Sequence, residues 1–213
     1  MGSYLAEVCD FIATHPHYAY WAVFFLALSE AIPIVGTVVP GSTLVLAISA
    51  LAAKADINAW LLLVAAIGGC IAGDGFSFWL GQHYHQEILR YWPLNRFPRF
   101  IARSESFFNR YGAASVFLAR FTAVVRAFVP LIAGILRMPA GQFYAANILS
   151  AVIWAPAHVF PGLLFGILVS LAGFGAEEIV VFVIAAMILG WALFRAVQWY
   201  LDRGILRWPG SRK

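Results

Sequence analysis

Long apolar runs separated by short polar stretches dominate the chain. The runs cover residues 18–35, 38–53, 57–80, 113–136, 143–171 and 179–201. A helix needs about 20 consecutive apolar residues to cross the hydrocarbon core of a bilayer, and most of these runs reach or approach that length. The pattern therefore predicts an all-α integral membrane protein.

The composition agrees with this prediction and excludes several classes of protein. Of the 213 residues, 62% are hydrophobic and 11% are charged, whereas soluble domains are about 45–50% apolar and about 25% charged. A disordered chain, a disulfide scaffold and a free-standing cytosolic enzyme are excluded. The sequence also lacks the nucleophile-elbow, zinc-protease and P-loop motifs, and its 2 cysteines give no metal or redox framework. We therefore expect no enzyme activity, no cofactor and no metal site.

Charges in the polar stretches predict the orientation of the chain. Residues 82–111 hold five arginines, the segment 173–178 holds Glu177 and Glu178 without a basic residue, and the end of the chain is basic again. Basic loops stay in the cytoplasm. We therefore expect the 82–112 loop and the C-terminus to be cytoplasmic and the acidic loop to face outside. The basic residues are read as orientation signals, so no nucleic-acid partner is expected.

This orientation requires one apolar run to enter and leave the membrane on the same side. Two runs, 113–136 and 143–171, separate a cytoplasmic loop from an external one, although an odd number of crossings must do so. The run 113–136 contains Arg120, Arg126 and Pro130, and we predict that it is a re-entrant helical hairpin. Residues 18–53 are similarly interrupted, at Pro40 and Gly41 among other positions. Broken backbone survives in a membrane only inside protein or beside a wet cavity, so both hairpins should be interior.

A faint internal repeat suggests that the two hairpins are inverted copies. Residues 25–27 and 117–119 are both Phe-Leu-Ala, and each is followed by an ionisable residue, Glu30 or Arg120. Inverted repeats are common in transporters. We therefore predict an N-terminal interfacial segment, 1–17, and a membrane domain, 18–171, with halves 18–81 and 113–171 joined by the basic loop 82–112. A final transmembrane helix and a basic cytoplasmic tail follow at 172–213.

Four ionisable residues lie inside apolar runs: Glu30, Asp74, Arg120 and Arg126. Each costs about 2.5–3.5 kcal/mol to insert into a membrane, so such residues usually mark a pathway. Two interpretations remain open at this point, one with structural ion pairs between acids and arginines and one with a polar cavity near the middle of the membrane.

The identities of these residues suggest roles in the second interpretation. A guanidinium stays charged and presents a planar fork of donors that suits phosphate oxygens, so Arg120 and Arg126 are predicted to bind an anionic head group. On a continuous helix, however, a spacing of six residues would separate them by about 240°. They converge only if the chain breaks between them. Glu30 and Asp74 are the candidates for proton coupling, because a carboxyl withdrawn from water is more easily protonated.

Other residues are assigned supporting parts. Gly69 and Gly73 form a small-xxx-small pair that allows close helix packing. Asn147 is expected to support a hairpin through its side-chain amide. The residues expected to shape the two hairpins are Pro40, Gly41, Ser42, Pro130 and Gly134.

Taken in order, these residues resemble the DedA family of bacterial inner-membrane proteins, whose shared module is also called the SNARE-associated or VTT domain. The resemblance covers about residues 20–165. It rests on Glu30 with Pro40-Gly41, residues 73–81 and 117–121, Arg126 followed by Pro130, Ala133-Gly134, Met138, Phe143, Asn147 and Trp154. The chain departs from the family at one position, because many relatives carry an acid directly after the Pro-Gly pair and this chain has Ser42.

The resemblance implies two inverted re-entrant hairpins and a role in moving lipids between leaflets. Bacterial members are linked to the recycling of undecaprenyl phosphate and to the proton-motive force, and Glu30, Arg120 and Arg126 match positions that the family requires. The leading hypothesis is therefore a flippase or scramblase for a phosphate-bearing lipid in the bacterial inner membrane. The alternatives are a proton-coupled antiporter of small cations or drugs and a structural envelope protein. The lipid species, the direction of movement, the side of the N-terminus and the oligomeric state stay open.

Overall fold

The computed structural model describes residues 14–33, 35–53, 57–84, 108, 110–120, 125–173, 181–182 and 185. Its helices are α2 (Pro16–Glu30), α3 (Val35–Val38), α4 (Gly41–Ala52), α5 (Ala59–His83), α8 (Ala113–Ala119), α9 (Val125–Ile135) and α10 (Ala140–Leu171). These residues contain no strand, so the all-helical prediction is confirmed for this part of the chain. Most of segment 1–17, of loop 82–112 and of segment 172–213 lies outside the described residues.

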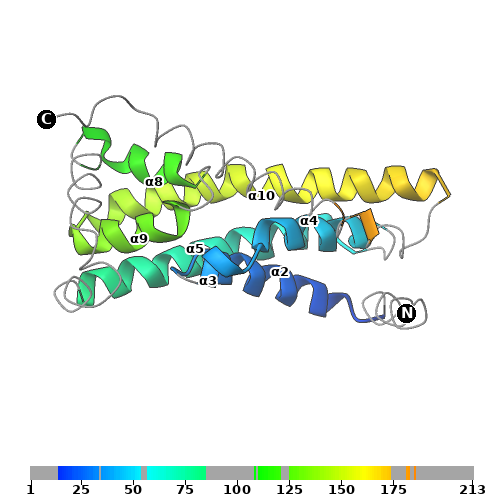
Figure 1. Ribbon diagram of the computed structural model, residues 1–213, viewed down its shortest axis with the longest axis horizontal. Coiled ribbons are helices and arrows are strands. Elements are labelled where there is room, and N and C mark those ends of the chain that lie inside the picture. The colour runs from blue at the N-terminus through cyan, green and yellow to red at the C-terminus, as the bar shows by residue number, and fades with distance from the viewer. Residues whose placement is uncertain are drawn as a thin grey trace, which may run out of the picture.

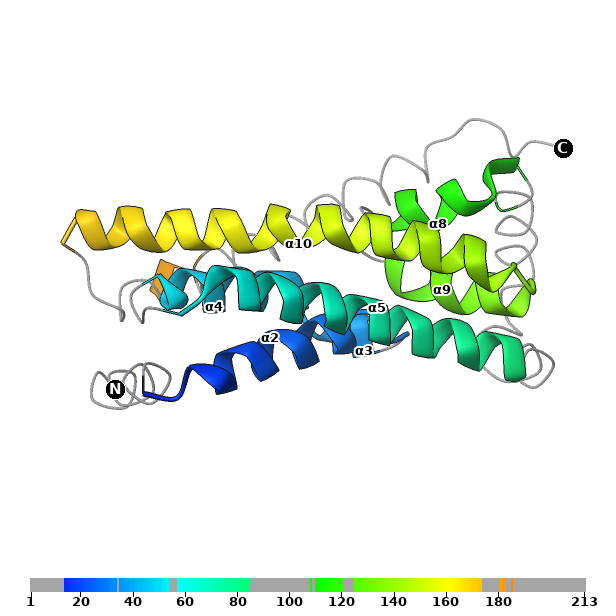
Figure 2. The same ribbon diagram turned by 180° about the vertical axis from the view of Figure 1, so that it is seen from behind.

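Two long helices form the axis of the molecule, and short helices flank each end. Figure 1 shows α5 and α10 running side by side along the longest axis, with α2 and α4 toward one end, α8 and α9 toward the other and α3 near the middle; Figure 2 shows the same arrangement from behind. Each short pair packs on both long helices: α2 on α5 and α4 on α10, then α9 on α5 and α8 on α10. Residues 18–81 and 113–171 thus contribute matching sets of helices.

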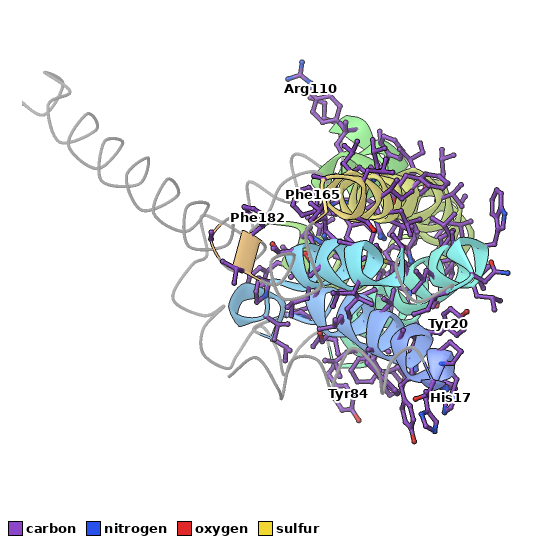
Figure 3. The ribbon with its side chains drawn as sticks, turned by 90° about the vertical axis from the view of Figure 1, so that its right-hand side faces the viewer. His17, Tyr20, Tyr84, Arg110, Phe165 and Phe182 are labelled. Carbon is purple, nitrogen blue, oxygen red and sulfur yellow. The ribbon has the colours of Figure 1, made fainter. Side chains whose placement is uncertain are left out.

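Of the helices in the described part, α5 and α10 are long and apolar enough to cross a membrane by length and composition, whereas α4 and α9 are shorter apolar helices. Large apolar side chains on α10 are exposed along its length, from Ile148 to Leu171. Exposed apolar surface of this extent is uncommon in soluble monomers. In the end-on view of Figure 3, His17, Tyr84 and Arg110 project outward from the bundle.

Local sequence explains where the helices begin and end. The Asn58 side chain accepts hydrogen bonds from the backbone N–H groups of Trp60, at 2.9 Å, and Leu61, at 3.4 Å, and so caps α5. Helix α2 ends at Glu30, three residues before Pro33, and the hydroxyl of Ser77 in α5 donates to the carbonyl of Ala31 at 3.1 Å. This bond satisfies a backbone acceptor that the broken helix leaves without an intrahelical partner.

The two larger apolar cores of the described residues lie along the axis, and polar residues separate them. One core gathers α2, α4, α5 and α10 around residues such as Leu62 and Val159; the other gathers α5, α8, α9 and α10 around Phe78 and Phe143, whose rings stack 4.0 Å apart. On α5 the first core reaches Cys70 and the second begins at Phe78, and Asp74 lies between them. On α10, Asn147 lies between Ala146 of one core and Ala151 of the other. The buried polar residues therefore form a layer near the middle of the bundle.

The predicted close packing of Gly69 and Gly73 is confirmed, because both glycines of α5 face the backbone of α2. A Cβ atom on Gly69 would clash with the carbonyl oxygen of Phe24, and one on Gly73 would lie 2.5 Å from the carbonyl oxygen of Leu28. Gly68, beside Gly69, is different: its nearest neighbour would be the ring of Phe24 at 3.6 Å, an ordinary contact.

This difference gives a matched test of the helix crossing. Gly69→Ala should lower the free energy of unfolding by about 1–3 kcal/mol, as overpacked cores do. Gly68→Ala should leave it unchanged or raise it by up to about 1 kcal/mol, because alanine favours the helix. Thermal unfolding in detergent micelles measures both variants. Equal stability of the two would show that α2 and α5 do not cross at Gly69.

Candidate functional site

The polar layer holds two ion pairs, each between helices far apart in the sequence. Arg120, directly after α8, pairs with Asp74 of α5, and Arg126, in the first turn of α9, pairs with Glu30 at the end of α2. All four residues are more than nine-tenths buried. The four residues that the sequence placed inside apolar runs therefore meet in one cluster.

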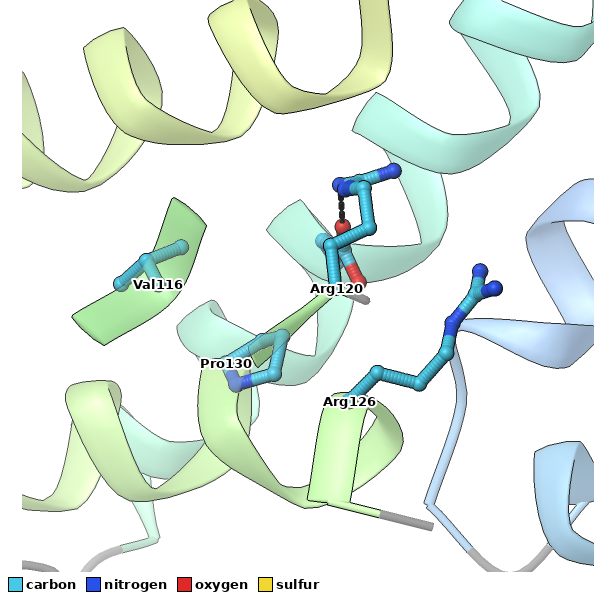
Figure 4. Close-up of a pocket in the computed structure, with 5 residues that line it drawn as sticks. Val116, Arg120, Arg126 and Pro130 are labelled. Atoms are coloured by element: carbon cyan, nitrogen blue, oxygen red, sulfur yellow. Dashed lines mark hydrogen bonds and ion pairs between the residues drawn. The ribbon is translucent and has the colours of Figure 1, made fainter. Parts of the chain in front are cut away.

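Arg120 is held by side chains from both long helices. Its Nη2 group donates to Oδ2 of Asp74 and to Oδ1 of Asn147 in α10. In Figure 4 a dashed line from the Arg120 guanidinium marks its ion pair with Asp74. Asn147, which was expected to support a hairpin, thus fixes an arginine.

Arg126 lies in a second set of contacts. Its Nη1 group donates to Oε1 of Glu30 at 2.9 Å, and the hydroxyl of Ser42 in α4 donates to the same oxygen. The guanidinium carbon lies 5.0 Å from the ring centroid of Trp154 in α10. This cation–π contact is favourable and strengthens when water is excluded.

The six-residue spacing of the arginines does not separate them, because α8 ends at Ala119 and α9 begins at Val125. In Figure 4 the side chain of Arg120, from just after α8, and that of Arg126, from α9, reach into the same region. Pro130, which was expected to shape this hairpin, lies inside α9, and the helix continues through it. The helical break therefore lies between the arginines, and Pro130 lines the cavity beside them.

A small cavity adjoins the ion pairs. Its volume is about 10 Å³, and it is lined by Asp74, Val116, Arg120, Arg126 and Pro130. This is room for about one water molecule and too little for a phosphate group. A head group therefore does not fit into this cavity as it stands.

Three buried polar atoms of the cluster have no hydrogen-bond partner among the described residues: Oε2 of Glu30, Nη1 of Arg120 and Nδ2 of Asn147. Buried polar groups are nearly always paired, so such atoms call for an explanation. One unpaired acceptor and two unpaired donors leave the site able to take up a further polar ligand.

The glycines expected to shape the hairpins allow close approaches. A Cβ atom on Gly41, the first residue of α4, would lie 2.6 Å from Oε2 of Glu30. Gly134 of α9 crosses Gly81 of α5, where added Cβ atoms would meet backbone of the opposite helix. Pro40 precedes α4 and gives it no side-chain cap.

Both interpretations of the four buried charges describe part of this geometry. Each arginine is paired with an acid, as in the structural interpretation, and the pairs also border a cavity, as in the functional one. A buried ion pair is weak evidence for stability, because desolvation of the two charges offsets most of their attraction. The described residues contain no group of three or more His, Cys, Asp or Glu side chains that could hold a metal ion.

Sequence reasoning missed Trp154 as a contact of Arg126 and assigned Ser42 only to the shape of the hairpin. A usable signal exists for the tryptophan. It lies near the middle of α10, whereas membrane tryptophans collect near the ends of spans. For the serine the signal is the departure from the acid that many members of the DedA family carry after the Pro-Gly pair. That departure does not identify Glu30 as its partner, which is 12 residues away across a helical break.

Comparisons with known proteins agree on one family. The VTT domain matches residues 39–164. The inner membrane protein YabI of Escherichia coli (strain K12) is 29% identical over 212 residues, which cover 93% of this chain and 84% of that protein. The DedA protein of the same organism is 25% identical over 163 residues, covering 75% of this chain and 74% of DedA.

An uncharacterized membrane protein of Synechocystis sp. is 37% identical over 145 residues, covering 67% of this chain and 65% of that protein. No solved structure matches the chain.

Proposed function

The chain belongs to the VTT domain family of membrane proteins, which includes DedA, and from this premise we propose that it moves a phosphate-bearing lipid between the leaflets of the bacterial inner membrane. Undecaprenyl phosphate is the proposed substrate. The site acts by binding and release, without a covalent step. Protons are proposed to couple to the movement.

The observation that carries this proposal is the burial of Arg120 and Arg126 in one polar layer between two apolar cores. Only the head group of a lipid needs a polar path, because its tail can remain in the bilayer along the apolar outer surface. Guanidinium groups bind phosphate oxygens with charge-assisted hydrogen bonds. In the structure the carboxylates of Asp74 and Glu30 are paired with the two guanidinium groups. Substrate binding is therefore an exchange of a carboxylate for a phosphate.

Helix lengths support re-entrant hairpins. At 1.5 Å per residue, the 12 residues of α4 span about 18 Å and the 11 residues of α9 about 16 Å. The hydrocarbon core is about 30 Å thick. We propose that the α2–α4 and α8–α9 pairs enter the membrane from opposite sides and meet at the polar layer. We also propose that the C-terminus is cytoplasmic, because basic residues lie near it.

Carboxyl groups provide a route for proton coupling. A protonated Glu30 or Asp74 loses its charge and with it most of its attraction for the paired arginine. The freed guanidinium then favours the lipid phosphate. Deprotonation of the acid after the cluster reopens restores the ion pair and expels the lipid.

The test is leaflet exchange of a fluorescent polyprenyl phosphate in liposomes that contain the purified protein. We expect rapid exchange by the wild type and exchange at the protein-free rate by Arg126→Ala. Arg126→Lys keeps the positive charge but loses the planar fork. It should therefore fold, but its rate of lipid exchange should be lower than that of the wild type by about tenfold or more. Arg110→Ala, at an exposed arginine, is the control and should match the wild type. Equal exchange by all four proteins would overturn the proposal.

A second candidate, a proton-coupled antiporter of small cations, is favoured by the unpartnered Oε2 atom of Glu30. A cation would need free carboxylate oxygens, and both acids are paired with arginines here. Substrate-driven proton flux in vesicles without polyprenyl phosphate separates the two candidates. Flux under these conditions would favour the antiporter, and its absence would remove it.

A further inference from the structure

The carboxylate of Glu30 lies at the start of α4 and contacts donors from two other elements. Its Oε1 atom accepts hydrogen bonds from Arg126 of α9 and from the hydroxyl of Ser42 in α4. Its Oε2 atom is buried without a partner among the described residues and lies 2.6 Å from the position of a Cβ atom on Gly41. An anionic group thus already lies beside the first residue of this helix.

The N-terminal turn of α4 presents backbone donors. No side chain caps this 12-residue helix, and the first N–H groups of a helix have no acceptor within the helix itself. Free N–H groups and the helix dipole make such a terminus attractive to anions. The absence of a Cβ atom on Gly41 allows the anion to approach the backbone.

The donors around Glu30 are of the kind that a phosphate group requires. A hydroxyl, a guanidinium and the amides of a helix N-terminus all donate, and a phosphate offers more acceptor oxygens than a carboxylate does. The cavity beside the arginines has room for about one water molecule. The Glu30 carboxylate already accepts hydrogen bonds from Arg126 and Ser42, so a phosphate can take these donors only when the carboxylate moves away.

We propose that Glu30 is the built-in occupant of a phosphate site formed by Arg126, Ser42 and the first turn of α4, and that a phosphate group takes this site when Glu30 is protonated and withdraws. This inference rests on the proposed function. It adds Ser42 and the first turn of α4 as donors to the phosphate and Glu30 as the group that competes with it. The other charged groups of the cluster are Asp74 on α5 and Arg120 after α8, which are paired with each other. In the exchange a proton binds the Glu30 carboxylate, and the phosphate oxygens accept the hydrogen bonds that the carboxylate gives up.

Binding of dodecyl phosphate to the purified full chain in maltoside micelles tests the inference without a bilayer. Glu30→Gln keeps the size of the side chain but removes its charge. Its amide N–H groups also face the donors of Arg126 and Ser42, which they cannot satisfy. We expect this variant to bind the probe about tenfold or more tightly than the wild type at neutral pH, because the competing occupant is gone.

A second pair of variants tests the proposed donors. In the Glu30→Gln background, Ser42→Ala should remove the gain in affinity. Ser49→Ala should keep it, because the hydroxyl of Ser49 bonds within α4 to the carbonyl of Val45 at 2.8 Å, away from the site. Should Glu30→Gln not fold, Glu30→Asp replaces it: the shorter side chain reaches α4 less well and should also bind the probe more tightly than the wild type.

The inference is overturned if neutralising or shortening Glu30 leaves the affinity unchanged, or if the two serine variants behave alike. Inorganic phosphate serves as a competitor. Displacement of the probe supports recognition of the phosphate group alone, and lack of displacement supports recognition of a lipid-borne phosphate. Binding as expected without leaflet exchange in liposomes would leave this inference standing and remove the proposed function.

Discussion

Arg120→Met is expected to reduce lipid exchange to the protein-free rate and to lower the free energy of unfolding by about 3–5 kcal/mol. The guanidinium of Arg120 forms an ion pair with Asp74 and donates to the side-chain oxygen Oδ1 of Asn147, and all three residues are buried. Removing one member of a buried ion pair leaves the other charge uncompensated, which is more destabilising than removing both. Methionine is similar in length and apolar, so the loss follows mainly from the charge.

The matched control is the double variant Asp74→Asn with Arg120→Met. It removes both charges and should recover most of the stability lost by Arg120→Met, whereas lipid exchange should stay at the protein-free rate. Thermal unfolding in detergent measures the first property, and the liposome assay measures the second. A single variant as stable as the wild type would show that Arg120 and Asp74 are not a buried pair. Exchange restored in the double variant would show that the charge of Arg120 does not act on the lipid.

The sequence alone was sufficient to locate most helices and the four buried charges. The apolar runs 18–35, 38–53, 57–80, 113–136 and 143–171 predicted the positions of α2, α4, α5, the α8–α9 pair and α10 within a few residues, because burial of the backbone in an apolar environment requires helices. The family resemblance is confirmed by the VTT domain match. Membrane character follows from the relatives that are named membrane proteins.

The pairing of the charges could not be predicted, because it depends on how helices cross. Arg120 pairs with Asp74 and Arg126 with Glu30, although either acid suits either arginine by charge. The choice follows from contacts such as Gly69 against Phe24 and Gly134 against Phe78, which fix the rotation and depth of α2 and α9 on α5. These contacts join residues more than 40 positions apart, and no local pattern reports them.

The helical break near the arginines shows a similar limit. Pro130 was a reasonable candidate for the break, because proline removes a helical hydrogen bond. Helix α9 nevertheless runs from Val125 to Ile135 and includes Pro130. Neighbouring helices can support a proline inside a membrane helix, and α9 packs on α5 and α8. Tertiary packing thus decides which interruption of an apolar run becomes a break.

Gly41→Val should also abolish lipid exchange and should lower the free energy of unfolding by several kcal/mol. A Cβ atom at this position would lie 2.6 Å from Oε2 of Glu30, 2.9 Å from its Cβ atom and 3.0 Å from the carbonyl oxygen of Leu26. The Glu30 carboxylate would have to move away from Arg126 and Ser42. The expected loss combines overpacking, about 1–3 kcal/mol, with the breaking of a buried ion pair, about 3–5 kcal/mol, and relaxation of the hairpin should recover part of the sum.

Gly141→Val is the matched control for this substitution. Gly141 also lies in the first turn of a helix that follows a proline, and a Cβ atom there would meet nothing within 4 Å. Both variants replace a helical glycine by the same β-branched residue, so a difference between them reports the contact with Glu30 and not helix propensity. We expect Gly141→Val to keep the wild-type melting temperature within a few degrees and to exchange lipid at the wild-type rate. If Gly41→Val did the same, the close approach of α4 to Glu30 would be wrong, and the phosphate site built on that approach would be wrong with it.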